Sequence, residues 1–189
     1  MFIDLLKKIY SFFFDTVQTI LIAASVFLVI YIFLMRPFEV SGDSMFPTYK
    51  NGEYILTNLI SLKFESPKRG DVIVFQAPED EDKDYIKRVI GVPGDTVMIA
   101  NNKVYINGSI LDEDSYISDT VQTPPGRFLE DGETVQIPEN SFVVMGDNRP
   151  HSSDSREWGF LPEEDIIGRS FFVYWPPTNM RTVKNPFDT

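Results

Sequence analysis

The chain has 189 residues, of which 43% are hydrophobic, so it is long and apolar enough to bury the core of one medium-sized domain. Its formal net charge of -11 argues against nucleic-acid binding, because neutralising phosphates requires a basic face. It has no cysteine and one histidine, which excludes disulfides and thiol catalysis and argues against a zinc site. We therefore expect neither a metal nor a cofactor.

An uncharged run of 20 residues lies between Asp15 and Arg36. As a helix it would be about 30 Å long, which matches the hydrocarbon core of a bilayer. The sequence thus predicts a short N-terminal segment at 1–15, a transmembrane helix at 16–35 and an extracytoplasmic domain at 36–189. Two alternatives are a cleaved secretory signal, for which the run is long and no small-x-small site follows, and a buried soluble helix, which rarely stays apolar on every face.

The charges that flank this run predict its orientation. Lys7 and Lys8 precede it, whereas Arg36 alone follows it closely. By the positive-inside rule, the N-terminus stays in the cytoplasm. The expected protein is therefore a single-pass protein of the cell membrane whose main domain faces outward.

Beyond the run, short apolar stretches of period two alternate with Gly, Pro, Asn and Asp, which is typical of antiparallel β structure. The expected strands are Glu53 to Thr57, Asp71 to Phe75, Tyr85 to Ile90, Thr96 to Ile99, Lys103 to Ile106, Thr134 to Ile137, Phe142 to Met145 and Arg169 to Trp175. The predicted fold is mainly β, an antiparallel β-sheet catalytic domain preceded by one transmembrane helix.

Turn residues divide this β domain. Asn101-Asn102 and Asn107-Gly108 suit tight hairpins, because asparagine and glycine tolerate positive φ. The polar stretch from Leu111 to Gly132 indicates a long excursion, and we expect a small inserted β subdomain at about 100–140. The acidic run at 78–84 is expected to be a solvated turn, since a calcium loop would need a glycine at its bend.

Ser44 lies in the segment SGDSMFPT (41–48), soon after the apolar run. Taken alone, this serine is most simply a turn hydroxyl. It becomes a candidate nucleophile only if a base lies near it, and one histidine leaves few choices.

Lys87, in DYIKRVIG (84–91), could be that base if its amine is neutral. Its pKa would have to fall by about 3 units from about 10.4, which requires an apolar environment. Strand alternation places Tyr85 and Val89 on the same face as Lys87. The alternative is an ordinary strand lysine with its amine in water.

A dense polar cluster, GDNRPHSSDSR (146–156), directly follows the apolar strand FVVM. It could be a simple surface loop. As support for a site, Ser152 could orient a neutral lysine, and Asp154 could pair with Arg156 to hold the loop rigid.

Together these segments resemble the type I signal peptidases, or leader peptidases. SGDSMFPT resembles the nucleophile motif of the family, RGDVIVF (69–75) its substrate-edge strand, YIKRVIGVPGD (85–95) its lysine motif and GDNRPHSSDSR its closing motif. The Gly-Asp pair before Ser44 is similar to Gram-positive bacterial members. The resemblance implies a membrane-bound serine endopeptidase that removes signal peptides through a Ser/Lys dyad.

The resemblance assigns roles to individual residues. It implies Ser44 as nucleophile, Lys87 as general base and Ser152 as the hydroxyl that orients Lys87, with structural roles for three further residues of the closing motif, Asp147, Asp154 and Arg156. The oxyanion hole would include the Ser44 backbone N–H. Gly42 stands where part of the family has a serine, which leaves a second oxyanion donor unassigned.

The resemblance also implies a substrate class. Members cut exported preproteins after small residues, commonly Ala-x-Ala, close to a lipid bilayer. The positions matching the family's substrate pockets are Phe38, Val40, Met45, Val74, Tyr85 and Ile86. A substrate would add as a strand to an exposed sheet edge.

Four other functions compete with this one. A Ser-His-Asp hydrolase would use His151 as base, but family members that use histidine carry it where this chain has Lys87. Self-cleaving SOS repressors share a Ser-Lys site but bind DNA, and the penicillin-binding class needs an S-x-x-K string that is missing. A membrane-tethered β domain without catalysis is the non-enzymatic alternative.

Overall fold

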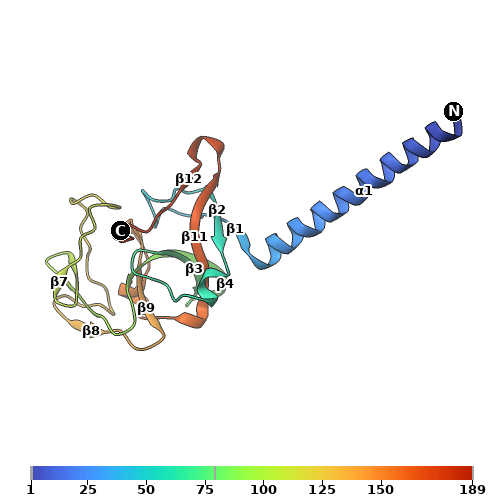
Figure 1. The fold of residues 1–189 in the computed structure, drawn as a ribbon. Coiled ribbons are helices and arrows are strands. Elements are labelled where there is room, and N and C mark those ends of the chain that lie inside the picture. Colours follow the sequence, from blue (N-terminus) through green and yellow to red (C-terminus); the bar gives the residue numbers. More distant parts are fainter. Residues whose placement is uncertain (1, 79, 189) are drawn as a thin grey trace.

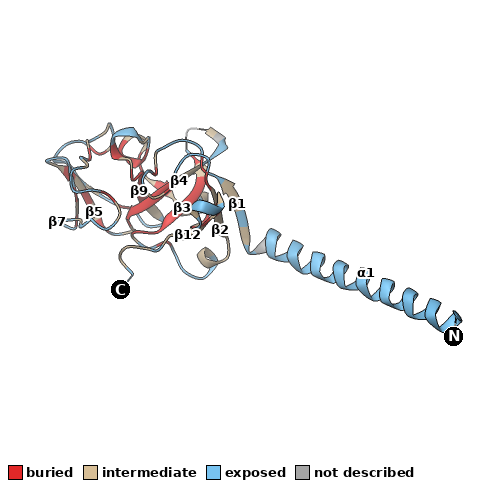
Figure 2. Cartoon of the chain, turned by 90° about the horizontal axis from the view of Figure 1, so that it is seen from above, coloured by how far each residue is buried: buried red, intermediate tan, exposed pale blue. Residues whose placement is uncertain are grey.

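The computed structural model describes residues 2–78 and 80–188, and for residues 32, 33 and 81 it describes the backbone alone. A single long helix, α1 (Phe2–Phe33), leads into a β domain (Figure 1). Its Phe2–Tyr31 stretch is long and apolar enough to cross a membrane, and none of its most apolar part is buried (Figure 2). Because an apolar helix exposed in this way must find an apolar surrounding, it fits the predicted membrane helix.

The expectation of a mainly antiparallel β domain is confirmed. The larger sheet has the order β1-β2-β11-β3-β4-β9-β10, with β12 paired to β11. Its strands are β1 (Met35–Glu39), β2 (Tyr54–Asn58), β3 (Val72–Ala77), β4 (Asp80–Gly91), β9 (Ser141–Met145), β10 (Leu161–Pro162), β11 (Ile166–Trp175) and β12 (Arg181–Thr182).

A smaller sheet of four strands has the order β7-β6-β5-β8. It is built from β5 (Thr96–Ala100), β6 (Lys103–Ile106), β7 (Ser109–Ile110) and β8 (Thr134–Gln136). Both predicted asparagine turns are present, because Asn101, Asn102 and Asn107 all have positive φ and connect antiparallel partners. The stretch at 111–132 lies between β7 and β8.

Short helical turns fill the remaining connections. They are η1 (Ser61–Lys63), η2 (Arg149–His151), α2 (Ser155–Trp158), η3 (Glu163–Asp165) and η4 (Pro177–Asn179). The Asp154 side chain caps α2 by accepting a hydrogen bond from the Arg156 backbone N–H. This is the usual way in which an aspartate starts a helix.

The acidic run was predicted wrongly as a turn. Residues 80–84 belong to β4, which starts at Asp80 rather than at Tyr85, and residue 79 of that run lies outside the described residues. Asp84 pairs with Gln76 of β3, so β3 and β4 form a longer hairpin than expected. This part of β4 could not be predicted, because its acidic residues show no alternation of apolar and polar side chains. It forms a strand nevertheless, because backbone pairing to β3 outweighs the low strand propensity of acidic residues.

The core lies mainly around β3, β4 and β9, which contain most of the buried strand residues (Figure 2). In β3 four consecutive residues, Val72 to Phe75, are buried, so both faces of this central strand are covered. One apolar cluster packs β3 against the segment after β1, through Val40, Met45 and Val74. The core thereby fixes the position of the Ser44 segment relative to β3 and β4.

Candidate active site

Ser44 lies in the nucleophile loop (residues 40–53), which connects β1 to β2. Gly42 has a φ of 91°, a conformation that favours glycine, and its N–H donates to Asn51 Oδ1 at 2.8 Å. Asn148 holds the loop from outside, because its backbone N–H donates to the Ser44 carbonyl at 3.0 Å and its side-chain amide donates to the Asp43 carbonyl at 3.1 Å. The Ser44 backbone is therefore fixed at several points.

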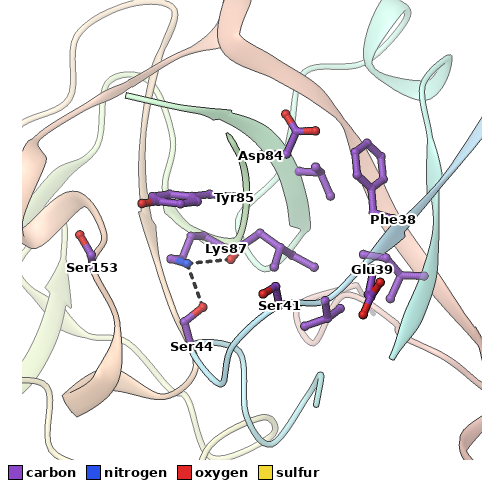
Figure 3. A pocket seen from close by; sticks show the side chains of 12 residues that line it. Phe38, Glu39, Ser41, Ser44, Asp84, Tyr85, Lys87 and Ser153 are labelled. Atoms are coloured by element: carbon purple, nitrogen blue, oxygen red, sulfur yellow. Dashed lines mark hydrogen bonds between the residues drawn. The ribbon is translucent and has the colours of Figure 1, made fainter. Parts of the chain in front are cut away.

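Lys87 lies in β4 and reaches the nucleophile directly. Its Nζ is 2.9 Å from Ser44 Oγ and 3.0 Å from the Ile86 carbonyl oxygen, and both contacts are drawn in Figure 3. The amine also lies 5.1 Å from the centre of the Tyr85 ring. Only 4% of Lys87 is exposed to solvent, so the amine is in a dry, largely apolar environment within hydrogen-bond distance of the hydroxyl.

This environment lowers the pKa of Lys87 from 10.5 to about 8, and burial of the amine is the main cause. The carboxylates of Asp154 and Asp147 act in the opposite direction and raise it. Their effect is smaller than that of burial, and each carboxylate is bound by an arginine. The amine is therefore poised to give up its proton near neutral pH.

The first of these pairs joins Asp147 to Arg88, the residue after Lys87. Arg88 Nε donates to Asp147 Oδ1 at 2.8 Å, and its Nη2 donates to Oδ2 at 2.7 Å. Both side chains are almost fully buried, and the Thr48 hydroxyl donates to the same carboxylate. Through Arg88, Thr48 and Asp147, these contacts connect β4, the nucleophile loop and the closing loop (residues 146–156) to one another.

The second pair forms inside the closing loop. Arg156 contacts Asp154 with two donors, Nε and Nη2, each at 2.8 Å. Asp154 Oδ2 also accepts from the Gly146 N–H at 3.0 Å, and Arg156 Nη2 donates to the Arg149 carbonyl at 2.7 Å. A two-point pair of this kind has a fixed geometry, so it makes the loop rigid.

Ser152, the predicted orienting hydroxyl, is close to the nucleophile loop but is not bonded to Lys87. Its Oγ is buried and has no hydrogen-bond partner among the residues that the structure describes. A methyl group added to Gly146 would lie 2.3 Å from Ser152 Oγ and 2.4 Å from the Ser44 carbonyl oxygen. Gly146 therefore allows the closing loop to approach the nucleophile loop closely.

A pocket of about 390 Å³, which we call the cleft, opens beside Ser44 and Lys87 (Figure 3). The lining residues are Phe38, Glu39, Val40, Ser41, Ser44, Ile55, Val74, Asp84, Tyr85, Ile86, Lys87 and Ser153.

Five of the six predicted substrate positions line this cleft, and the sixth, Met45, does not. Met45 is fully buried in the core because it follows the outward-facing Ser44 in the same turn. Sequence reasoning missed Glu39, Ser41, Ile55, Asp84 and Ser153. For Glu39 and Asp84 a signal existed, since each is next to a predicted pocket residue.

The rival base, His151, lies in η2 and is exposed. The side chain within hydrogen-bond distance of Ser44 Oγ is that of Lys87. The geometry therefore favours a serine activated by lysine over a serine activated by histidine.

Comparison with known proteins identifies the family of the chain. The family model described as signal peptidase, peptidase S26, matches residues 13–175. Signal peptidase IB of Staphylococcus aureus (strain Mu50 / ATCC 700699) is 34% identical, over 93% of this chain and 97% of the relative. Probable signal peptidase I-1 of Synechocystis sp. is 36% identical, over 88% of this chain and 85% of the relative.

A crystal structure of a signal peptidase I from Enterococcus faecalis V583 matches this chain with 32% sequence identity and a TM-score of 0.47. The match covers 56% of this chain and 97% of the Enterococcus chain. The family model spans most of the chain, including all four motifs, and the curated relatives match it almost from end to end. The chain therefore belongs to the signal peptidase family, peptidase S26, as a type I signal peptidase.

Proposed function

We propose that this serine protease removes N-terminal signal peptides from exported preproteins by acyl transfer at a dyad of Ser44 and Lys87. The observation that carries this mechanism is the 2.9 Å separation of Ser44 Oγ from a buried amine whose pKa is lowered to about 8. A neutral amine at this distance can take the hydroxyl proton as the oxygen attacks a carbonyl carbon.

The reaction proceeds in two halves with one base. Lys87 Nζ accepts the proton of Ser44 Oγ as the oxygen bonds to the scissile carbonyl carbon. The resulting ammonium then protonates the departing amine, and an ester remains on Ser44. In the second half, Lys87 takes a proton from water, the hydroxide attacks the ester and the proton returns to Ser44 Oγ. The Ser44 backbone N–H stabilises the negative oxygen in both halves.

The supporting residues act by holding these groups in position. In this proposal Asp147, Asp154 and Arg156 fix the closing loop against Ser44 and β4, and Ser152 orients the neutral amine. The buried ion pairs support the first role. The unbonded hydroxyl of Ser152 beside the nucleophile loop supports the second, because a buried hydroxyl without a partner has donor capacity to spare.

The preferred substrates carry small residues at the first and third positions before the scissile bond, as in Ala-x-Ala. Large side chains on the cleft walls, namely those of Phe38, Tyr85 and Ile86, leave little depth for a substrate side chain. The substrate strand would run between β1 and β4, which supply half of the residues that line the cleft.

The lipid bilayer is the second proposed partner. In this proposal residues 1–15 lie on the cytoplasmic side, residues 16–35 cross the cell membrane once and residues 36–189 form the extracytoplasmic domain, with a small β insertion at about 100–140. The exposed apolar surface of α1 supports the membrane location, and Lys7 and Lys8 before the span support the orientation.

The test is cleavage of a purified preprotein by the full chain in detergent micelles. Lys87→Ala should abolish processing, whereas His151→Ala and the exposed-lysine control Lys103→Ala should retain it. A serine-directed acylating probe should label Ser44 in the wild type. Equal processing by wild type and Lys87→Ala would refute the dyad, and no labelling of Ser44 would favour a non-catalytic β domain.

A further inference from the structure

Two carboxylates, Asp84 and Glu39, line the cleft away from the nucleophile. Asp84 belongs to β4 and Glu39 to β1, and both side chains are exposed. Figure 3 shows them on the side of the cleft occupied by Phe38, with Ser44 on the other side. A substrate strand that fills the cleft must therefore pass between or beside two negative charges.

These charges are not neutralised from within the cleft. Among the described residues, Asp84 has no ion pair or side-chain hydrogen bond, and Glu39 accepts only from the neutral Tyr54 hydroxyl at 3.0 Å. Lys87 is the one basic residue among those that line the cleft, so two carboxylates face a single amine even when that amine is protonated. Arg36 stacks at 5.0 Å on the Phe38 ring and is not part of the lining. The cleft therefore presents a net negative surface.

An apolar surface accompanies the two carboxylates. Phe38 and Ile86 also line the cleft and are half-buried, so their side chains remain available for contact. Lysine and arginine bury their methylene stems on apolar surface while the charged group reaches a polar one. This combination suits a basic substrate side chain better than a neutral polar one.

We infer that Asp84 and Glu39 are specificity-determining residues, which select preproteins carrying Lys or Arg shortly before the cleavage site. The inference rests on the proposed function, because it assumes that the cleft holds a signal peptide. The aliphatic stem of the basic residue packs on Phe38 and Ile86, and its charge pairs with the two carboxylates.

The path of the chain indicates which side of the scissile bond is affected. β1 runs from the end of α1 toward Ser44, so the Glu39 end of the cleft is the end nearer to α1. The apolar part of a signal peptide precedes its cleavage site and occupies the same bilayer as α1. The substrate segment beside Asp84 and Glu39 is thus the one that precedes the scissile bond.

Spacing along β4 gives the position within that segment. Asp84 precedes Lys87 by three residues, which is about 10 Å along a strand. A substrate strand of the same rise places its third or fourth residue before the scissile bond at that distance. Since the third is small in the proposed substrates, the fourth is the expected site of the basic residue.

The test is a competition between paired peptides that differ only by Lys or Gln at the second, fourth or fifth residue before the bond. Purified full-length chain in micelles receives both peptides together, and mass spectrometry gives the ratio of their kcat/KM values. We expect a preference for lysine of about threefold to tenfold, greatest at the fourth residue, in line with exposed charge pairs. The preference should shrink as salt is added.

Variants of the chain assign this preference to the two carboxylates. Asp84→Asn and Glu39→Gln should each lower the Lys/Gln ratio, and Asp84→Lys should favour a glutamate peptide instead. Asp82→Asn, which removes an exposed charge from the same strand outside the cleft, should keep the ratio. A ratio of one in the wild type, or a ratio unchanged in both Asp84→Asn and Glu39→Gln, would overturn the inference alone, whereas failure to cleave any peptide would refute the proposed function.

Discussion

The guanidinium of Arg149 in the closing loop is bound by the carboxylate of Glu113, which belongs to the stretch between β7 and β8. Arg149 Nη1 donates to Glu113 Oε2 at 3.0 Å and to the Thr123 hydroxyl at 2.6 Å, and its Nη2 donates to Glu113 Oε1. Arg149 is 1% exposed. The closing loop beside Ser44 is thus held in place by the stretch between β7 and β8, none of whose residues line the cleft.

Glu113→Ala should therefore destabilise the domain and impair cleavage together. It leaves a buried guanidinium without its counterion, a change that typically costs about 3–5 kcal/mol. Urea unfolding of the full chain in micelles measures the loss. The matched control is Asp114→Ala, an exposed neighbour, for which a change within about 0.5 kcal/mol is expected. Equal stability of the two variants would mean that Glu113 is not needed to stabilise the buried charge of Arg149.

The lowered pKa of Lys87 predicts the pH dependence of cleavage. The reacting form is the neutral amine, and with a pKa of about 8 roughly a tenth of the enzyme carries it at pH 7. We expect kcat/KM to fall about tenfold for each pH unit below 8 and to level off above it. A rate profile that is flat between pH 6 and 9 would contradict a lysine base.

Removing the same amine should stabilise the fold. The pKa of Lys87 is 10.5 in the unfolded chain and about 8 in the folded one, so the unfolded state binds more protons between these values. Stability should therefore rise with pH across that window, and below it the buried charge costs about 3 kcal/mol. At pH 7 we expect Lys87→Met to unfold at higher urea than wild type while losing activity, and the exposed-site control Lys103→Met to unfold like wild type.

Gly146→Ala tests the close approach of the closing loop to the nucleophile. The added methyl would lie 2.4 Å from the Ser44 carbonyl oxygen, so one of the two loops must move. A displacement of about 1 Å in a catalytic group can lower a rate on the order of 10²-fold. We expect this loss in kcat, with far less change in binding of a non-cleavable peptide. Full activity in the variant would show that Ser44 tolerates the displacement.

The sequence predicted most of the strands that the structure describes and missed β1, β7, β10 and β12. The eight expected strands are all present, with ends shifted by a few residues. β1 was missed because Met35 continues the apolar run and Pro37 interrupts the pattern. Proline is tolerated there because β1 is an edge strand of the larger sheet. The two-residue strands β7, β10 and β12 are too short to show a period.

The residues of the candidate active site could be predicted from the sequence only in part. Ser44 and Lys87 could be paired before their geometry was visible, because SGDSMFPT and YIKRVIGVPGD resemble the nucleophile and lysine motifs of one family. The burial of Met45 could not be predicted, since it depends on how β1, β3 and β4 pack together. The dry environment of Lys87 depends on the same packing.

The short connection between α1 and Ser44 has a consequence for how turnover should be measured. β1 begins two residues after α1 ends and pairs along its whole length with β2, so little slack separates the helix from the nucleophile loop. With α1 in a bilayer, enzyme and preprotein meet by lateral diffusion in two dimensions. Rates should then follow the number of molecules per unit of lipid area, and adding empty lipid at constant volume should slow cleavage by surface dilution.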